Sequence, residues 1–171
     1  ARDRNAVRST STGAQLKVPR QRDVTKVYGR PGNSQCTAGV VNLPYPMHLA
    51  WDKSKRIRRF KCHAKVASRM QRIFDKVYAH YGSRVHSLGL DSFGGCYNLR
   101  KMRGGSRYSM HSWGIAVDLD PANNRLKWGR NRAKFARPEY DKFWEIVESE
   151  GGVSLGRERN FDWMHFQFAR L

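Results

Sequence analysis

Residues 109–120 read SMHSWGIAVDLD, and this stretch decides the fold that we expect. From Ile115 to Asp120, apolar residues alternate with small or acidic ones, which is typical of a β-strand with one face in the core. The other face presents the carboxylate of Asp118. His111 lies just before Gly114, which predicts a glycine turn leading into the strand. The stretch therefore predicts an imidazole and a carboxylate held close together on rigid backbone.

Two helices are predicted from hydrophobic periodicity. Between Phe60 and Tyr81, apolar residues recur at steps of three and four with Lys and Arg between them. This pattern predicts an amphipathic helix with a basic outer face that stops at Gly82. The second helix is predicted over Glu139–Glu150, opened by Pro138 and ended by the two glycines that follow.

Further strands are predicted from shorter patterns. The end of the chain, Trp163–Ala169, alternates so that His165 and Gln167 share one face. Turn residues flank three more candidates, which are Val40–Leu43, Arg84–Leu90 and Gly94–Arg100. A turn is expected around Asp91–Phe93, between the last two.

The composition describes a single, strongly basic domain. The chain has 171 residues, 39% of them hydrophobic, and a formal net charge of +19. This length and apolar content suit one folded domain. Residues 1–30 are basic and rich in Ser and Thr, which predicts an extended arm or linker before a folded domain over 31–171. A charge of this size attracts polyanions such as nucleic acid, anionic lipid or the bacterial envelope.

The cysteines give no framework of their own. Cys36, Cys62 and Cys96 are odd in number and widely spaced, unlike a disulfide scaffold or a cysteine zinc finger. We expect buried thiols in a protein made in a reducing cytoplasm.

Three residues have the chemistry of a catalytic zinc site. His111, Asp118 and His165 all project from rigid elements, and two imidazoles with one carboxylate form a tripod for zinc. Such a tripod leaves a fourth position open for water, as catalytic sites do.

The neighbouring residues suggest how such a site would work. Asp162 lies just before the strand of His165 and could take the proton of the water and pass it to a leaving amine. A cation is also needed for the oxyanion, and Arg100 is the first candidate and Arg103 the second.

The same residues carry a family resemblance. Residues 109–118 resemble the S-x-H-x-x-G-x-A-x-D signature of the bacterial and phage zinc D-alanyl-D-alanine carboxypeptidase and L-alanyl-D-glutamate endopeptidase family. Residues 162–167, DWMHFQ, are similar to its closing D-x-x-H-x-Q element. Residues 95–100, GCYNLR, resemble the strand that bears its oxyanion arginine, although the family often has Gly-Tyr-Arg there.

This resemblance implies both a fold and a set of roles. The fold is α+β, with a small antiparallel sheet flanked by helices, as in D-Ala-D-Ala carboxypeptidases and the hedgehog signalling domain. The implied roles are zinc binding by His111, Asp118 and His165, acid/base catalysis by Asp162, oxyanion binding by Arg100 and substrate contacts by Ser109 and Tyr97.

We therefore expect a zinc-dependent peptidoglycan peptidase of the phage endolysin type. It would cut the stem peptide between L-Ala and D-Glu, using water activated by Zn2+. We expect it to be a monomer made in the host cytoplasm without a signal peptide, and to act on the wall after release. Its basic surface would bind lipopolysaccharide or teichoic acid, and no specific nucleic acid is expected.

Three alternatives remain open on the sequence. A D,D-carboxypeptidase would use the same site on free peptide ends. A basic nucleic-acid-binding module would explain the charge but would leave the tripod and Asp162 without a role. A purely structural metal would not need an uncoordinated acid beside it.

Overall fold

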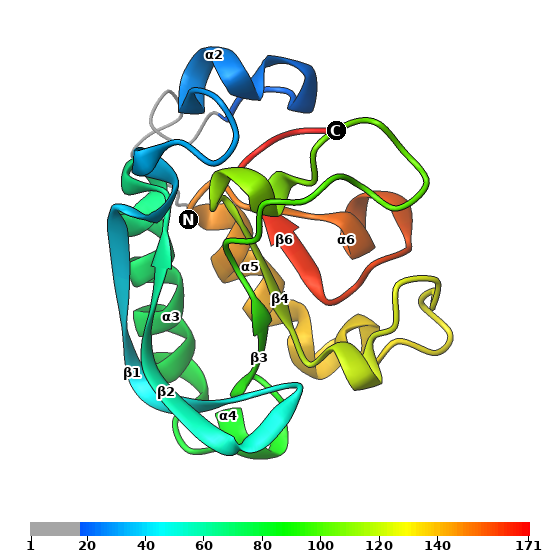
Figure 1. Cartoon of the computed structure of the whole chain (residues 1–171). Helices are drawn as coiled ribbons and strands as arrows, with labels where there is room; N and C mark the ends of the chain where they lie inside the picture. The colour runs from blue at the N-terminus through cyan, green and yellow to red at the C-terminus, as the bar shows by residue number, and fades with distance from the viewer. Residues whose placement is uncertain (1–17) are drawn as a thin grey trace, which may run out of the picture.

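A mixed sheet of six strands forms the centre of the fold (Figure 1). The structure is a computed structural model that describes residues 18–171. The strand order is β2-β1-β3-β4-β6-β5. The strands are β1 (Gly39–Leu49), β2 (Asp52–Cys62), β3 (Ser92–Gly95), β4 (Ala116–Leu119), β5 (Val153–Ser154) and β6 (His165–Gln167). The predicted α+β class is confirmed, and the sheet departs from the expected antiparallel one where β1 and β3 run parallel.

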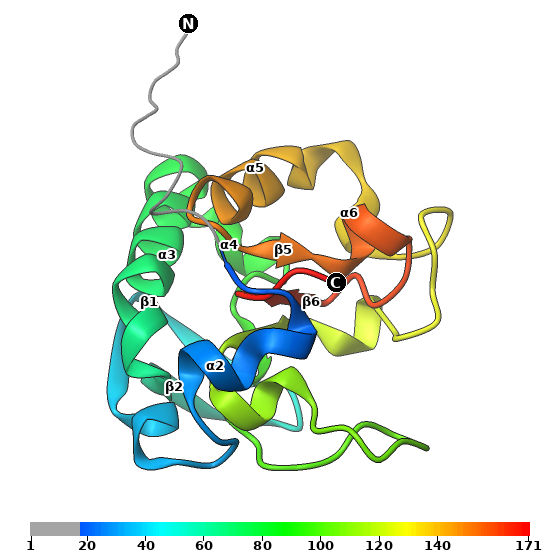
Figure 2. The same cartoon turned by 90° about the horizontal axis from the view of Figure 1, so that it is seen from above.

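Helices cover one face of this sheet. The α-helices are α2 (Val24–Tyr28), α3 (Ala67–Tyr81), α4 (Arg84–Ser87), α5 (Asp141–Ser149) and α6 (Leu155–Arg159). The 3₁₀ helices are η1 (Gln21–Asp23), η2 (Ser34–Thr37), η3 (Ala64–Val66), η4 (Met110–Trp113), η5 (Pro121–Asn123), η6 (Lys134–Ala136) and η7 (Pro138–Tyr140). Both α3 and α5 lie behind the sheet in Figure 1 and to the same side of it in Figure 2.

The core explains why α3 and α5 pack there. Each helix buries one apolar face, and the two faces include Phe74 and Val77 of α3 and Phe143 and Trp144 of α5. A fully buried side chain of this size contributes about 1.5–3 kcal/mol. The predicted second helix is confirmed, with η7 forming its first turn.

The first predicted helix begins later than expected. Phe60 belongs to β2, and α3 starts only at Ala67. The Phe60 ring lies 4.9 Å from that of Phe93 and 5.8 Å from that of Phe74, so it fills the core from a strand. The predicted stop at Gly82 is confirmed, because its N–H donates to the carbonyl of Tyr78 and its φ is 55°.

Two of the short strand predictions are wrong. Residues 84–87 form α4 rather than a strand, and residues 94–100 share only their first two positions with β3. The expected turn around Asp91–Phe93 is instead the entry to β3, which is held between β1 and β4. Neighbouring strands therefore decide this element. In contrast, Val40–Leu43 lies within the longer β1, and the strands predicted around Asp118 and His165 are confirmed as β4 and β6.

The segment that precedes β1 packs against the end of the chain. Of the predicted arm, residues 1–17 lie outside the described residues. Beyond them, Val18 and Val24 are buried, and the Tyr28 hydroxyl donates to the carbonyl of Phe168 at 2.8 Å. Figure 2 shows α2 in front of β6. Residues 18–30 therefore contribute to the environment of β6.

Among residues 18–171, no helix combines the length and the apolarity that crossing a membrane requires. Cys36, Cys62 and Cys96 are all buried and free, as predicted.

Candidate metal centre

Two neighbouring strands and one 3₁₀ helix bring His111, Asp118 and His165 together. Asp118 of β4 and His165 of β6 are directly paired in the sheet. Asp118 Oδ1 lies 2.9 Å from His165 Nδ1, and its Oδ2 lies 3.1 Å from Nε2 of His111 in η4. The three ligand atoms all lie within 4.8 Å of one another.

Local backbone chemistry places His111. Ser109 caps η4, because its Oγ accepts a hydrogen bond from the N–H of His111 at 3.2 Å. Gly114 ends η4 in the left-handed region with a φ of 70°. A Cβ at Gly114 would lie 2.2 Å from the carbonyl oxygen of Cys36, so only glycine fits this turn. Ser109, predicted as a substrate contact, therefore has a positioning role in the structure.

A backbone carbonyl sets the tautomer of His111. The carbonyl oxygen of Cys96 lies 2.7 Å from Nδ1 of His111. A carbonyl can only accept, so Nδ1 carries the proton and donates it. In the neutral ring, Nε2 then holds a lone pair that points at Asp118.

Gln167 sets the tautomer of His165 in the same way. The amide nitrogen of Gln167 donates to the carbonyl of Ala169 at 2.9 Å and to Oε1 of Gln21 at 2.7 Å. Its amide oxygen therefore faces His165, where Nε2 lies 2.8 Å away and must donate. The lone pair of the neutral ring is left on Nδ1, toward Asp118.

This arrangement requires positive charge between the three residues. Two ring nitrogens with lone pairs face the two oxygens of one carboxylate, so either protons or a metal ion must lie between them. Burial opposes the charge on Asp118, but His111 and His165 outweigh it and hold the pKa of that carboxyl far below its usual range. Burial likewise opposes the charge on His165, but Asp118 raises the pKa of that imidazole to about 9.

The donor set therefore fits a divalent metal ion. Two imidazoles and a carboxylate are the ligands expected of a catalytic zinc site, and each imidazole has an outer hydrogen-bond partner that orients it. Metal binding would release the protons that otherwise occupy this position.

Asp162 lies beside the tripod. Its Oδ2 is 3.9 Å from Nδ1 of His165, and its side chain is 13% exposed. It adopts a φ of 55°, with its N–H donating to the carbonyl of Leu126 and its own carbonyl accepting from the N–H of His165. Burial raises the pKa of Asp162 to about 6, although the charge of His165 acts in the opposite direction. A carboxyl poised near neutral pH is suited to exchange protons with water.

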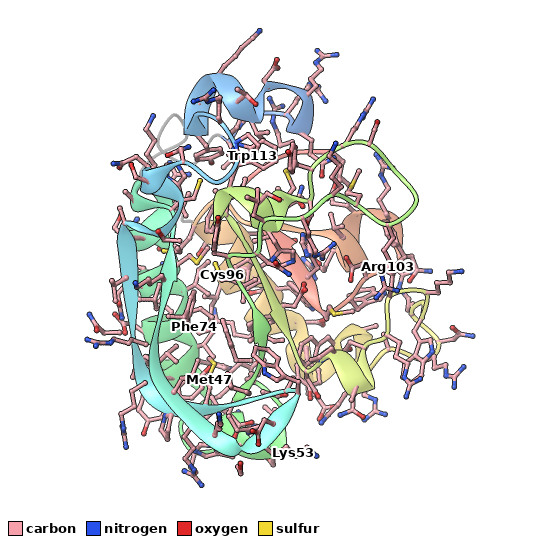
Figure 3. All side chains as sticks on the ribbon, viewed as in Figure 1. Met47, Lys53, Phe74, Cys96, Arg103 and Trp113 are labelled. Atoms are coloured by element: carbon pink, nitrogen blue, oxygen red, sulfur yellow. The ribbon has the colours of Figure 1, made fainter. Side chains whose placement is uncertain are left out.

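The remaining predicted residues differ in position. Arg100 is exposed, its charge lowers the pKa of Asp162, and Ser112 Oγ anchors its backbone. Arg103 projects from the exposed loop that follows (Figure 3). The Tyr97 hydroxyl lies next to Gly32, and no hydrogen bond within residues 18–171 joins it to the tripod.

Sequence reasoning missed the outer partners of the tripod. Strand alternation predicts that Gln167 shares a face with His165, and this pattern could have indicated that the two side chains interact. The carbonyl of Cys96 had no signal, since any residue supplies one. Gln21 is separated from Gln167 by 146 positions, and no local pattern joins them.

Residues 103–168 match a family model described as D-alanyl-D-alanine carboxypeptidase. The matched segment contains the whole tripod and Asp162, and it begins after Arg100. Searches of curated proteins and of solved structures gave no match to this chain. The family match and the metal-ligand geometry together support a metallopeptidase-type enzyme.

Proposed function

We propose that this protein is a zinc-dependent peptidase that hydrolyses an amide bond in the stem peptide of bacterial peptidoglycan. The observation that carries the proposal is the tripod of His111, Asp118 and His165, with the partly buried Asp162 at 3.9 Å from His165. Zinc, when bound, would act as a Lewis acid and lower the pKa of water. The nucleic-acid-binding alternative gives these four residues no task.

The protein's own residues would handle the proton and the charge. Asp162 would accept a proton from the attacking water and return it to the leaving amine, which one carboxyl near neutral pKa can do in both directions. Arg100 would oppose the negative charge that develops on the substrate carbonyl oxygen. Cys96 and Gln167 would hold the two imidazoles in the tautomers that ligate.

For the scissile bond, we propose the one between L-Ala and D-Glu. The alternative is a D,D-carboxypeptidase, and the description of the matched family model favours that activity. Purified stem peptides separate the two, because an endopeptidase releases L-Ala from the rest of the stem, whereas a carboxypeptidase releases only terminal D-Ala.

The wider setting is a further part of the proposal. We propose a monomeric lysin of the phage type, made in the host cytoplasm and acting on the wall after release. Its net charge of +19 supports attraction to anionic envelope polymers such as lipopolysaccharide or teichoic acid. Six exposed cations lie on β2, and they are Lys53, Lys55, Arg56, Arg58, Arg59 and Lys61.

The proposal is tested by metal content and wall lysis together. Elemental analysis of the purified protein should give one zinc per chain, and His165→Ala should lose both the zinc and the lysis of outer-membrane-stripped bacteria. His80→Ala is the matched control, because His80 is exposed on α3. Zinc-free wild type that still lyses the wall, or lysis that survives His165→Ala, would overturn the proposal.

A further inference from the structure

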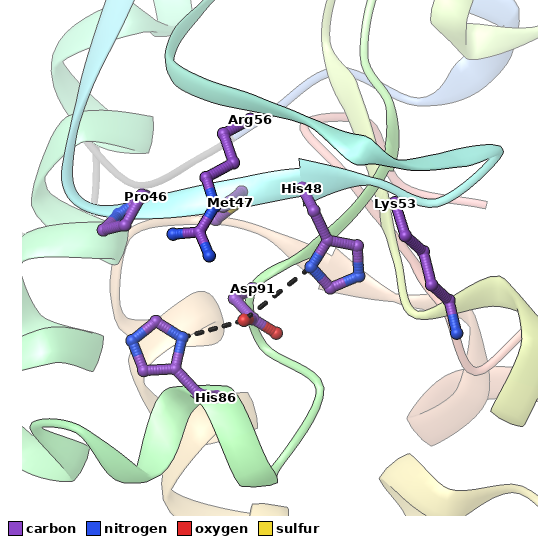
Figure 4. A pocket seen from close by; sticks show the side chains of 7 residues that line it. All are labelled: Pro46, Met47, His48, Lys53, Arg56, His86 and Asp91. Carbon is purple, nitrogen blue, oxygen red and sulfur yellow. Dashed lines mark hydrogen bonds and ion pairs between the residues drawn. The ribbon is translucent and has the colours of Figure 1, made fainter.

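A second cluster of charged side chains lies away from the tripod, in a pocket of about 410 Å³. The β1–β2 hairpin forms one side of it, and α4 with the residue before β3 forms the other (Figure 4). The polar residues that line it are His48 of β1, Lys53 and Arg56 of β2, His86 of α4, and Asp91. No role in the tripod or in the proposed hydrolysis accounts for them.

The one carboxylate in the pocket already has partners within it. Asp91 Oδ2 lies 2.8 Å from His86 Nδ1 and 3.8 Å from His48 Nδ1. The Asp91 side chain is only 14% exposed. Its backbone carbonyl also accepts from the N–H of His48 at 2.9 Å, which fixes the position of β1 against it. The two imidazoles are therefore the side-chain partners of this carboxylate within the pocket.

The two stronger cations have no such partner. Within residues 18–171, the ion pairs of Asp91 are made with the two imidazoles, and neither Lys53 nor Arg56 lies within ion-pair distance of a carboxylate. Figure 4 shows both side chains reaching down from the hairpin, on either side of His48. Other cations of β2 add to the positive potential at this place.

We propose that this pocket binds a phosphate group. Arg presents paired N–H donors that match phosphate oxygens, and Lys supplies a compact positive charge. Bound phosphate would supply the counter-charge that Lys53 and Arg56 lack among residues 18–171. A divalent metal ion is disfavoured in the same pocket, because both cations would repel it.

Strand β3 connects the pocket with the tripod. Asp91 immediately precedes β3, and Gly95 of β3 is paired with Asp118 of the tripod. Four residues of strand span roughly 13 Å. A phosphate site here would give the proposed binding of an anionic envelope polymer a place close to the metal centre. Phosphate binding rests on that part of the proposed function and does not require peptide hydrolysis.

The experiment adds inorganic phosphate stepwise and follows the NMR signal of each histidine. The chain has six histidines, and the imidazole Cε1–Hε1 signals are followed by NMR, with His48→Asn and His86→Asn assigning two of them. The full chain is titrated with inorganic phosphate, with chloride at equal ionic strength as the control. We expect saturable shifts at His48 and His86, which separates this site from phosphate bound at His111 or His165.

Matched charge variants separate a pocket from general attraction. Lys53→Gln/Arg56→Gln removes the cations of the pocket, and Lys55→Gln/Arg59→Gln removes the same charge from exposed positions of the same strand that do not line it. We expect phosphate binding to weaken by about tenfold in the first variant and by less than about twofold in the second. Equal weakening in both, or no saturable shift at His48 and His86, would overturn the proposal. Shifts produced by zinc but not by phosphate would overturn it as well.

Two further probes identify the source of the phosphate. A glycerol phosphate oligomer offers the phosphodiesters of a wall polymer, and phosphatidic acid vesicles offer a lipid headgroup, with phosphatidylcholine vesicles as the blank. If the oligomer displaces inorganic phosphate, as read from the signals of His48 and His86, the ligand is a polymer. If the wild-type protein cosediments with phosphatidic acid vesicles and Lys53→Gln/Arg56→Gln does not, the ligand is a lipid. Because none of these assays uses peptidoglycan hydrolysis, their failure would leave the peptidase proposal standing.

Discussion

The amide oxygen of Gln167 accepts a hydrogen bond from Nε2 of His165 at 2.8 Å, so the side chain two residues further along β6 decides which nitrogen of His165 can ligate. Gln167 is itself oriented by the carbonyl of Ala169 and by Gln21. The metal centre is therefore supported from the segment before β1 as well as from the sheet.

Replacing Gln167 with Leu should weaken zinc binding by about 10–100-fold, the usual effect of removing an outer partner of a metal-bound imidazole. Gln21→Ala should have a smaller effect, because the carbonyl of Ala169 still orients the amide. Zinc affinity is measured by competition with a chelator. The control is Gln71→Leu, which removes two hydrogen bonds to Asn42 far from the tripod. Unchanged zinc affinity in Gln167→Leu would contradict the role assigned here.

The residues of the tripod could be selected from the sequence because their signals are local. His111, Gly114 and Asp118 lie within one turn and one strand, and both the periodicity and the family signature act at that range. The outer partners could not be predicted in this way. Gln21 meets Gln167 only because the chain ends pack together, as the hydrogen bond between the N–H of Arg170 and the carbonyl of Pro19 shows.

The missed strands have a different cause. In β2, Lys and Arg occupy positions on both faces of an edge strand, so the alternation that reveals a half-buried strand is absent. In β3, two of four residues are glycine, and its pairing with β1 and β4 rather than its own propensity makes it a strand. By contrast, α5 and β4 bury a regular set of apolar residues, and both were predicted.

Asp162→Asn should leave zinc bound but lower kcat by about 10²–10⁴-fold, since an amide cannot carry the proton. Asn is the appropriate replacement because Asp162 has a φ of 55°, a conformation that Asn tolerates well. Zinc content and hydrolysis of a purified stem peptide are measured on the same preparation. Activity that stays near the wild-type value, with zinc present, would exclude Asp162 as the acid/base.

Gly114→Ala should destabilise the protein by about 3 kcal/mol, combining the cost of a left-handed residue with that of overpacking. The added Cβ would lie 2.2 Å from the carbonyl oxygen of Cys36 and 2.9 Å from the backbone nitrogen of His63. Gly104→Ala is the control, because Gly104 also has a positive φ, of 69°, but open space around its Cβ position, and about 1 kcal/mol is expected there. Urea unfolding measures both variants. Equal losses would mean that the close approach at Gly114 is relieved by a backbone shift.

His63 should make the protein less stable as the pH falls below neutral. Burial lowers the pKa of this imidazole, and the charge of Lys65 acts in the same direction, while the hydrogen bond to the Tyr28 carbonyl acts against them. The unfolded chain, with an ordinary histidine pKa of about 6.5, then binds a proton at a pH where the folded protein does not. Because the unfolded state holds more protons, the free energy of unfolding decreases as the pH drops through this value.

The variant His63→Asn removes this titration, so its free energy of unfolding should fall less between pH 7.5 and pH 5.5 than that of wild type. His80→Asn is the control, since His80 is exposed on α3, and it should follow the wild-type trend. Urea unfolding at the two pH values gives the comparison. Acid loss of metal affects all three proteins alike, so only the difference between them reports on His63. If His63→Asn and wild type lost stability in parallel, His63 would not be the source of the acid sensitivity.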